Sequence, residues 1–273
     1  MSGSPVGLND ILVDPEFREA LVSSGLSGSA EIMAFAGGEL LTYKGKRDRS
    51  VVKLALADGR AVFLKRYYTV PVKRKMIARA SRPQASAEAS REREAIGLFR
   101  KNGLPTVRIV ATGESFNMTE EIEGSISLEE YVAKRFSPPL DREAIDEKRR
   151  IIRELALLTR KMHKASLSHK DYYLGHIFVR PDDLSFFVLD LQRVDSRLRW
   201  GDRWAVKDIA ALDFSALPEF VSPADRMRFF KVYWGTDRLD GAAKRFMRRV
   251  LRKREKIARH TEKLLARREE KEK

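Results

Sequence analysis

The chain has 273 residues, of which 43% are hydrophobic and 34% are charged. This composition fits a folded protein and carries too much charge for a chain that is mostly embedded in a membrane. Cysteine is absent, which excludes disulfides, thiolate metal sites and a cysteine nucleophile. The N-terminal residues lack the basic start and apolar core of a signal peptide, and no apolar run approaches the ~20 residues of a spanning helix. We therefore expect a cytoplasmic protein.

The charge is strongly positive, with 54 lysines and arginines against 39 aspartates and glutamates, which gives a net charge of +15 and a pI of about 10.0. Such a field attracts polyanions, whether nucleic acid, acidic lipid or phosphorylated saccharide. Neither an RNP motif nor a zinc-finger spacing is present, so we expect no nucleic-acid partner.

The first half of the chain predicts a small antiparallel sheet with one helix, over residues 40–124, after an N-terminal extension over residues 1–39. Asp58 and Gly59 form a hairpin signal between two of the strands. Gly103 followed by Pro105 marks the end of the helix. The predicted strands cover residues 40–43, 50–56, 61–68, 106–111 and 115–122, and the predicted helix covers residues 86–102.

The second half, residues 125–273, predicts a larger and mainly helical lobe. Gly124 marks a hinge, and Ser127 and Glu130 have the spacing of a capping box. A second hairpin is expected from residues 177–179 and 186–189. The basic C-terminal helix, residues 242–273, repeats apolar residues every seven positions, and we expect this stripe to dock on the body. The positions of the stripe are Val250, Ile257, Leu264, Leu251, Ala258 and Leu265.

One segment of the helical half carries the strongest chemical signal. His169, Lys170 and Asp171 are followed five positions later by His176, and Asp190 ends the next predicted strand. This layout resembles a kinase catalytic loop and the metal motif that follows it. An aspartate on the loop accepts the proton of the acceptor hydroxyl, and a carboxylate at a strand end binds the metal that neutralises developing charge. Asp171 is the expected catalytic base.

The sheet half supplies the other parts of a kinase in the expected order. Lys65 lies on the third strand, where kinases place the lysine that binds the α- and β-phosphates. Its expected partner is Glu92, because Ile96 and Phe99 place that glutamate on the core-facing side of the helix. Glu88 and Glu94 are the alternatives. The inter-lobe hinge, whose backbone would bind adenine, is expected around Glu120 and Ile122.

Taken together, these stretches resemble the lipopolysaccharide core heptose kinase and Kdo kinase family (WaaP-like), over about residues 40 to 235. The resemblance implies an α+β, two-lobed protein-kinase-like fold with ATP between the lobes and Mg²⁺ or Mn²⁺ as the metal. It also implies that Asp190 and His176 bind metal and that Lys65 and Glu92 anchor the nucleotide. The stretches are residues 92–96 and 103–106, Thr119 to Glu121, Met162 with His163, 169–176, Asp190 to Arg193 and Lys207 to Leu212.

Several residues depart from the usual kinase pattern. Mg²⁺ prefers oxygen ligands, so His176 could instead orient Asp171 or a bound water. No glycine-rich loop is present, and Gly45 is the only candidate to cover a phosphate. The segment from Arg193 to Lys207 is too short for the activation segment that docks peptide substrates, which favours a non-protein acceptor. His163 and Asp208 are expected to brace the catalytic loop.

The expected activity is therefore phosphorylation of a heptose or Kdo hydroxyl on lipid-linked core oligosaccharide. Basic residues from Lys73 to Arg82 and from Lys244 to Lys273 suggest peripheral contact with the anionic inner face of the membrane. A protein or small-metabolite kinase on the same fold is the alternative. A kinase-like binding module is disfavoured because Lys65, Asp171 and Asp190 are all present.

Overall fold

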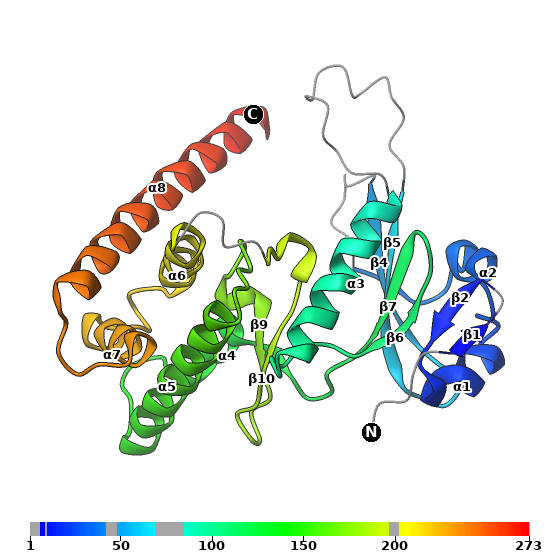
Figure 1. The fold of residues 1–273 in the computed structure, drawn as a ribbon, viewed down its shortest axis with the longest axis horizontal. Helices are drawn as coiled ribbons and strands as arrows, with labels where there is room; N and C mark the ends of the chain where they lie inside the picture. The colour runs from blue at the N-terminus through cyan, green and yellow to red at the C-terminus, as the bar shows by residue number, and fades with distance from the viewer. Residues whose placement is uncertain (1–5, 9, 42–47, 69–84, 197–201, 273) are drawn as a thin grey trace. The chain divides into compact units, whose positions relative to one another are not determined.

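The computed structural model describes residues 6–272 except residues 9, 42–47, 69–84 and 197–201. Two compact units make up the chain (Figure 1): residues 1–98 with 106–123, and residues 99–105 with 124–273. Gly45 and the basic residues from Lys73 to Arg82 lie outside the described residues.

The first unit is built on an antiparallel sheet with the strand order β1-β2-β6-β7-β5-β4-β3. Alternate side chains of the paired strands β4 and β5 point to one buried face, as the period of a strand requires: Val52 and Leu54 on β4, Val62 and Leu64 on β5. Gly59 adopts a φ of +86° in the turn that joins these strands. The strands are β1 (Val6–Leu8), β2 (Ile11–Val13), β3 (Glu39–Leu40), β4 (Arg49–Ala55), β5 (Ala61–Tyr67), β6 (Ile109–Thr112) and β7 (Phe116–Glu120).

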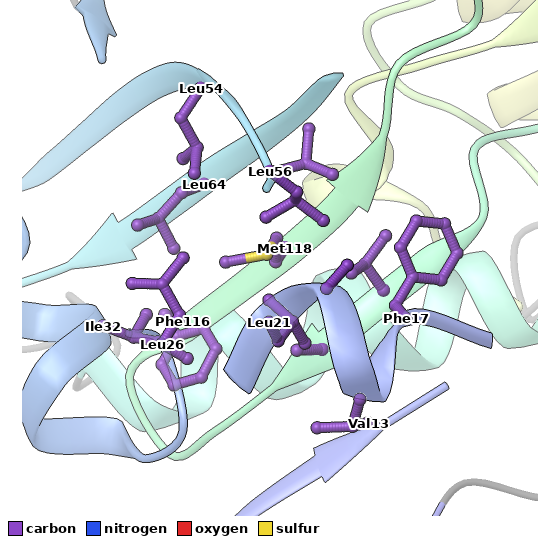
Figure 2. Close-up of a cluster of buried hydrophobic side chains, with 14 of the residues drawn as sticks. Val13, Phe17, Leu21, Leu26, Ile32, Leu54, Leu56, Leu64, Phe116 and Met118 are labelled. Atoms are coloured by element: carbon purple, nitrogen blue, oxygen red, sulfur yellow. The ribbon is translucent and has the colours of Figure 1, made fainter. Parts of the chain in front are cut away.

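The described residues of the expected N-terminal extension, 6–8 and 10–39, contribute strands and core to this unit. Strand β2 pairs with β6, so that Leu12 lies opposite Thr112 and Val13 opposite Ala111. The following residues form a 3-10 turn η1 (Pro15–Phe17) and two short helices, α1 (Arg18–Ser23) and α2 (Ser29–Ala34). Figure 2 shows side chains from these helices meeting side chains of the sheet in one apolar cluster. The labelled members are Val13, Phe17, Leu21, Leu26, Ile32, Leu54, Leu56, Leu64, Phe116 and Met118.

The helix of the first half, α3 (Ala85–Lys101), carries its buried side chains at helical spacing. Ala89, Ile96 and Phe99 are all shielded from solvent. The helix ends where the sequence predicts, because Gly103 adopts the left-handed conformation and Leu104 donates its N–H to the carbonyl of Phe99 at 2.9 Å.

The second unit combines five helices with a small sheet of strand order β10-β9-β8 among its described residues. The predicted hairpin is present, with Ile177 paired to Val188 and Val179 to Phe186. Ser127 caps the first helix by accepting the N–H of Glu130. The elements are β8 (Ile126–Ser127), α4 (Leu128–Arg135), α5 (Arg142–Lys164), η3 (Leu174–His176), β9 (Ile177–Val179), β10 (Phe186–Val188), η4 (Leu191–Arg193), α6 (Arg203–Ser215), α7 (Pro223–Trp234) and α8 (Gly241–Glu272).

Helices α5 to α8 share an apolar core in which aromatic rings meet. The ring centroids of Phe246 and Trp234 lie 5.2 Å apart, and those of Phe246 and Tyr233 lie 6.0 Å apart. Val206 and Ile209 of α6 pack into the same cluster. These contacts hold the first turns of α8 against α6 and α7.

The prediction that the whole apolar stripe of α8 docks on the body is wrong for its C-terminal part and for Leu251, which is 42% exposed. Val250 is buried and Ile257 packs against the core, but Leu264 and Leu265 are 43% and 51% exposed. Helix length explains the difference: at 1.5 Å per residue, α6 is about 20 Å long and α8 about 48 Å. The last turns of α8 therefore extend beyond the helix on which it packs.

In the part of the chain that the structure describes, every helix is too short or too polar to cross a bilayer.

Candidate active site

Lys65 of β5 and Glu92 of α3 form an ion pair in the first unit, with Nζ 2.6 Å from Oε1. Glu92 is 6% exposed, whereas the alternative partner Glu94 is exposed on the helix surface. Ile96 and Phe99, buried on the same side of α3, turn Glu92 toward the sheet. The pairing is thus a consequence of the buried face of α3.

Two further side chains hold the second carboxylate oxygen of Glu92. The Tyr67 hydroxyl donates to Oε2, and the Asn117 amide lies 3.4 Å from the same oxygen. Asn117 also donates to the carbonyl of Ala89 at 2.9 Å, which ties β7 to α3. A carboxylate with several donors is fixed in one orientation, and it presents Lys65 at a defined position.

The expected hinge residues lie at the end of β7. Glu120 donates its backbone N–H to the carbonyl of Arg108 at 2.9 Å. That donor is already used within the sheet, so adenine would have to bind other backbone groups of this segment. Ile122 follows the strand, outside any helix or strand, and is partly buried.

In the second unit the catalytic-loop candidate is organised by Asp208 of α6, whose side chain is 0% exposed. Its Oδ2 accepts the N–H of His169 at 2.9 Å and the hydroxyl of Ser168 at 2.8 Å, and its Oδ1 accepts the N–H of Lys170 at 2.7 Å. His163 Nε2 donates to Oδ2 from 3.3 Å. Charge-assisted bonds of this kind offset the loss of hydration of a buried carboxylate. The two bracing residues expected from the sequence, His163 and Asp208, are thus in contact.

The backbone of the loop is bent at Lys170, which has a φ of +67°. A lysine is uncommon in this left-handed region, and such residues concentrate at functional sites. His169, on the other side of the bend, is buried and donates Nε2–H to the carbonyl of Leu189 at 2.8 Å. Burial lowers the pKa of His169, which keeps its ring neutral at neutral pH.

Asp171, the candidate base, follows this bend and has two cations beside it. Arg193 Nη1 donates to both carboxylate oxygens at 2.8 Å, and Lys207 Nζ lies 3.8 Å from Oδ1. The side chain of Asp171 is partly exposed, as a proton acceptor for a bound hydroxyl must be.

The β9–β10 hairpin brings His176 and Asp190 together. Because Ile177 pairs with Val188, the residues that flank the pair are neighbours, and Leu189 donates its N–H to the carbonyl of His176 at 2.9 Å. His176 Nε2 lies 3.9 Å from Asp190 Oδ2, and its Nδ1–H donates to the backbone carbonyl of Asp171 at 2.7 Å. Asp190 has a φ of +56°, a second left-handed residue at this site.

The donor set fits a divalent cation that is bound mainly by nucleotide phosphates. Among the described residues no three His, Asp or Glu side chains gather into a metal cluster. Mg²⁺ is commonly held by one or two carboxylates together with substrate phosphates, so the residue here that would hold it is Asp190. His176 Nε2 faces the same place, and its Nδ1 contact also orients the loop of Asp171.

Arg193 and Lys207 are the residues of this site to which the sequence assigned no role. Both occur in the stretches that resemble the kinase family, directly after the metal motif and directly before Asp208. Their positions beside Asp171 depend on η4 and α6, and the chain spacing alone gives no indication of that contact.

The Lys65–Glu92 pair predicts strong coupling in unfolding experiments. Lys65→Ala and Glu92→Ala should each destabilise the protein, and the double variant should lose less than the sum by about 1–3 kcal/mol. Glu92→Ala should cost more than Lys65→Ala, since it also leaves Tyr67 and Asn117 without their carboxylate. Urea unfolding of the four proteins measures the coupling, with exposed Glu94→Ala as control. Additive losses would contradict the pair.

The family model described as lipopolysaccharide kinase (Kdo/WaaP) family matches residues 50–233. The lipopolysaccharide core heptose(I) kinase WaaP of Escherichia coli strain K12 is 30% identical over 237 residues, which cover 81% of this chain and 87% of the relative. The protein of the same name from Pseudomonas aeruginosa is 33% identical over 162 residues, covering 54% and 59% of the two chains.

Two solved structures are also similar. A WaaP in complex with acyl carrier protein has a TM-score of 0.67 and 25% sequence identity, and the match covers 90% of this chain and 98% of that one. The Rio2 kinase of Chaetomium thermophilum, in a complex of ADP/Mg²⁺ and phosphoaspartate, has a TM-score of 0.51 at 14% identity, covering 87% and 75%. The second likeness concerns the fold alone.

These matches confirm the α+β, kinase-like fold and the kinase activity expected from the sequence. A catalytic-loop aspartate, a neighbouring strand-end aspartate and a lysine–glutamate pair are present in a chain that matches the family model over most of its length. The chain belongs to the lipopolysaccharide kinase (Kdo/WaaP) family.

Proposed function

We propose that this protein transfers the γ-phosphate of ATP to a hydroxyl of a heptose or Kdo sugar in the lipid-linked inner core of lipopolysaccharide. The observation that carries the proposal is the environment of Asp171, a partly exposed carboxylate on a loop that the buried Asp208 holds rigid. Asp171 lies within residues 50–233, the range that matches the lipopolysaccharide kinase family model.

Each unit contributes a separate task. Lys65, held by Glu92, binds nucleotide phosphates as a positioned cation. Asp190 holds a divalent cation, Mg²⁺ or Mn²⁺, which neutralises phosphate charge when it is bound. His176 keeps the loop of Asp171 in place through the backbone carbonyl that accepts its Nδ1–H.

Asp171 acts as the base and as the anchor of the acceptor. An acceptor hydroxyl must lie within about 2.6–3.2 Å of the carboxylate that accepts its proton. The left-handed backbone at Lys170 and the bonds to Asp208 leave the Asp171 side chain on the exposed side of the loop. Hydroxyl binding and proton acceptance therefore belong to one side chain.

The acceptor class follows from the short connection after the metal motif and from the relatives. Only residues 194–202 separate η4 from α6, too few for a peptide-docking segment. Similar proteins carry the name heptose(I) kinase, which favours heptose over Kdo as the first acceptor to test.

Substitution of the two aspartates should separate chemistry from metal binding. Asp171→Asn should lower turnover at least ~100-fold while ATP affinity stays unchanged, because proton acceptance belongs to the transition state. Asp190→Asn should weaken Mg²⁺-dependent ATP binding as well as turnover. Radiolabelled ATP with core oligosaccharide that lacks phosphate measures turnover, and calorimetry measures ATP binding.

Asp146, an exposed aspartate on another surface that pairs with Arg149, provides the matched control. Asp146→Asn makes the same chemical change there. Near-normal turnover of Asp171→Asn would remove it from the role of base. Transfer to a generic protein but not to core oligosaccharide would favour the alternative of a protein kinase.

We also propose that the protein works at the cytoplasmic face of the inner membrane and contacts it through α8. The exposed part of this helix carries cations beside Leu264 and Leu265, which are both largely accessible. Attraction to an anionic lipid surface contributes about 1 kcal/mol per nearby lysine or arginine. The exposed cations of the last turns are Arg252, Lys256, Arg259, Lys263 and Arg267.

Vesicle binding tests this contact. The wild-type protein should sediment with anionic vesicles at low salt and be released at high salt. Replacement of Arg252, Lys256, Arg259 and Lys263 by glutamate should abolish sedimentation without changing ATP affinity. The exposed Lys134, on α4, provides the control position. Indifference of the wild-type protein to anionic vesicles at low salt would refute the membrane contact.

A carrier protein is a second partner that we propose, because one similar solved structure is a WaaP in complex with acyl carrier protein. The helical unit of the present chain contains a cavity of about 540 Å³ with mainly apolar walls. Apolar walls of this size fit an acyl group. The lining includes Leu128, Ile151, Leu212, Phe230 and Val250.

Binding of an acylated carrier protein should raise the melting temperature, since a ligand that binds only the folded state stabilises it. The unacylated carrier should have a smaller effect. Ala216→Trp, which reduces the cavity, should abolish the difference between the two carriers, whereas Ala242→Trp on the exposed start of α8 should preserve it. Equal shifts with both carriers in the wild-type protein would disprove the use of the cavity.

A further inference from the structure

Two cations, Arg193 and Lys207, lie beside the carboxylate of Asp171. In the described part of the chain, the carboxylate within 4.0 Å of each side-chain cation, Arg193 and Lys207, is that of Asp171. The neighbouring cation Lys170 has its own partner, since its Nζ lies 2.7 Å from Asp195 Oδ2. Of these two cations, Arg193 is hydrogen-bonded to Asp171 and Lys207 is not, so the ammonium of Lys207 has donors left for an anion.

Lys207 is the more firmly held of these two cations. It lies in the second turn of α6, one residue before the buried Asp208, and its ammonium donates to the backbone carbonyl of Lys170. Its side chain is 21% exposed, against 62% for Arg193. The ammonium thus has a fixed position beside the candidate base.

The ammonium of Lys207 is also poorly compensated. Its distance of 3.8 Å from Asp171 Oδ1 is too long for a hydrogen bond, and Arg193 already occupies that carboxylate. Burial lowers the pKa of Lys207, the charge of Arg193 adds to this shift, and Asp171 and Asp208 oppose it. A partly buried cation without a hydrogen-bonded carboxylate is stabilised when an anion binds beside it.

We propose that Lys207 is a further catalytic residue, whose ammonium donates hydrogen bonds to the phosphoryl group as that group passes to the acceptor oxygen. This role rests on the proposed kinase function. The acceptor oxygen must lie within hydrogen-bonding distance of Asp171, and Lys207 Nζ is 3.8 Å from the same carboxylate. The ammonium is therefore next to the position at which the new P–O bond forms.

The step balances without any further reactant. The acceptor hydroxyl gives its proton to Asp171, and its oxygen forms a bond to the γ-phosphorus. The bond between that phosphorus and the β–γ bridging oxygen breaks, and its electron pair leaves with ADP. Lys207 stays protonated throughout and stabilises the charge on the transferring oxygens, as preorganised donors do.

Three variants of Lys207 distinguish this role from a brace of the loop. Lys207→Met removes both the charge and the bond to the Lys170 carbonyl. Lys207→Gln keeps a donor but removes the charge, and Lys207→Arg keeps the charge. The matched control is Lys161→Met, because Lys161 likewise donates to a backbone carbonyl, that of Gly103 at 2.6 Å. Turnover, the KM for ATP and the melting temperature are measured for each protein.

We expect Lys207→Met and Lys207→Gln to lower kcat at least ~100-fold, the loss typical of one transition-state donor. In both variants the KM for ATP should change less than about threefold, because the charge is needed mainly in the transition state. Lys207→Arg, which keeps the charge, should retain at least roughly a tenth of the wild-type activity. Lys161→Met should keep normal turnover. Lys207→Gln decides the question if the methionine variant is unfolded.

Near-normal kcat in Lys207→Gln would overturn the role of Lys207 while the wild-type activity still supports the kinase function. Equal losses in the glutamine and arginine variants, together with a lower melting temperature, would show a brace and overturn it as well. A wild-type protein that phosphorylates no core oligosaccharide would overturn the proposed function itself, and the role of Lys207 with it.

Discussion

The second unit depends on one buried carboxylate, that of Asp208. Its four donors come from α5 and from three successive residues of the loop, Ser168 to Lys170. Transfer of a carboxylate out of water costs several kcal/mol, so this arrangement is stable only while all of these donors are present. The same bonds bend the backbone at Lys170 and thereby determine where Asp171 lies. The position of the candidate base thus depends on hydrogen bonds that replace the hydration of a buried charge.

A second constraint is the register of the β9–β10 hairpin. The pair Ile177–Val188 brings the ends of two short strands together, and Leu189 bonds to His169 through its carbonyl and to His176 through its N–H. Asp190 follows in a left-handed conformation, which an aspartate adopts more easily than most residues. The side chains of His169, His176 and Asp190, up to 21 positions apart in the chain, are therefore brought together by the pairing of the backbone and not by attraction between the side chains.

The electrostatics of the two units differ in a way that suits their proposed tasks. In the first unit, Lys65 is matched by a carboxylate at 2.6 Å, and the pair is nearly neutral. In the second, Arg193 and Lys207 both lie beside Asp171, where they would offer cationic donors to a phosphoryl group. Part of the large positive charge of the chain lies on the exposed turns of α8. These turns extend beyond α6, its packing partner, because α8 is the longer helix.

The sequence by itself determined the order of strands and helix between residues 49 and 120, the second hairpin, and the identity of Lys65, Glu92, Asp171 and Asp190 as candidates. These follow from local rules: strand and helix periodicity, glycine at positive φ, and the five-residue spacing of a catalytic loop. Only the tertiary structure placed Arg193 and Lys207 beside Asp171, added residues 6–34 to the sheet unit, and left Leu264 and Leu265 of α8 exposed. Such contacts join residues that are distant in the chain, and they depend on the lengths and packing of whole helices, which no local pattern encodes.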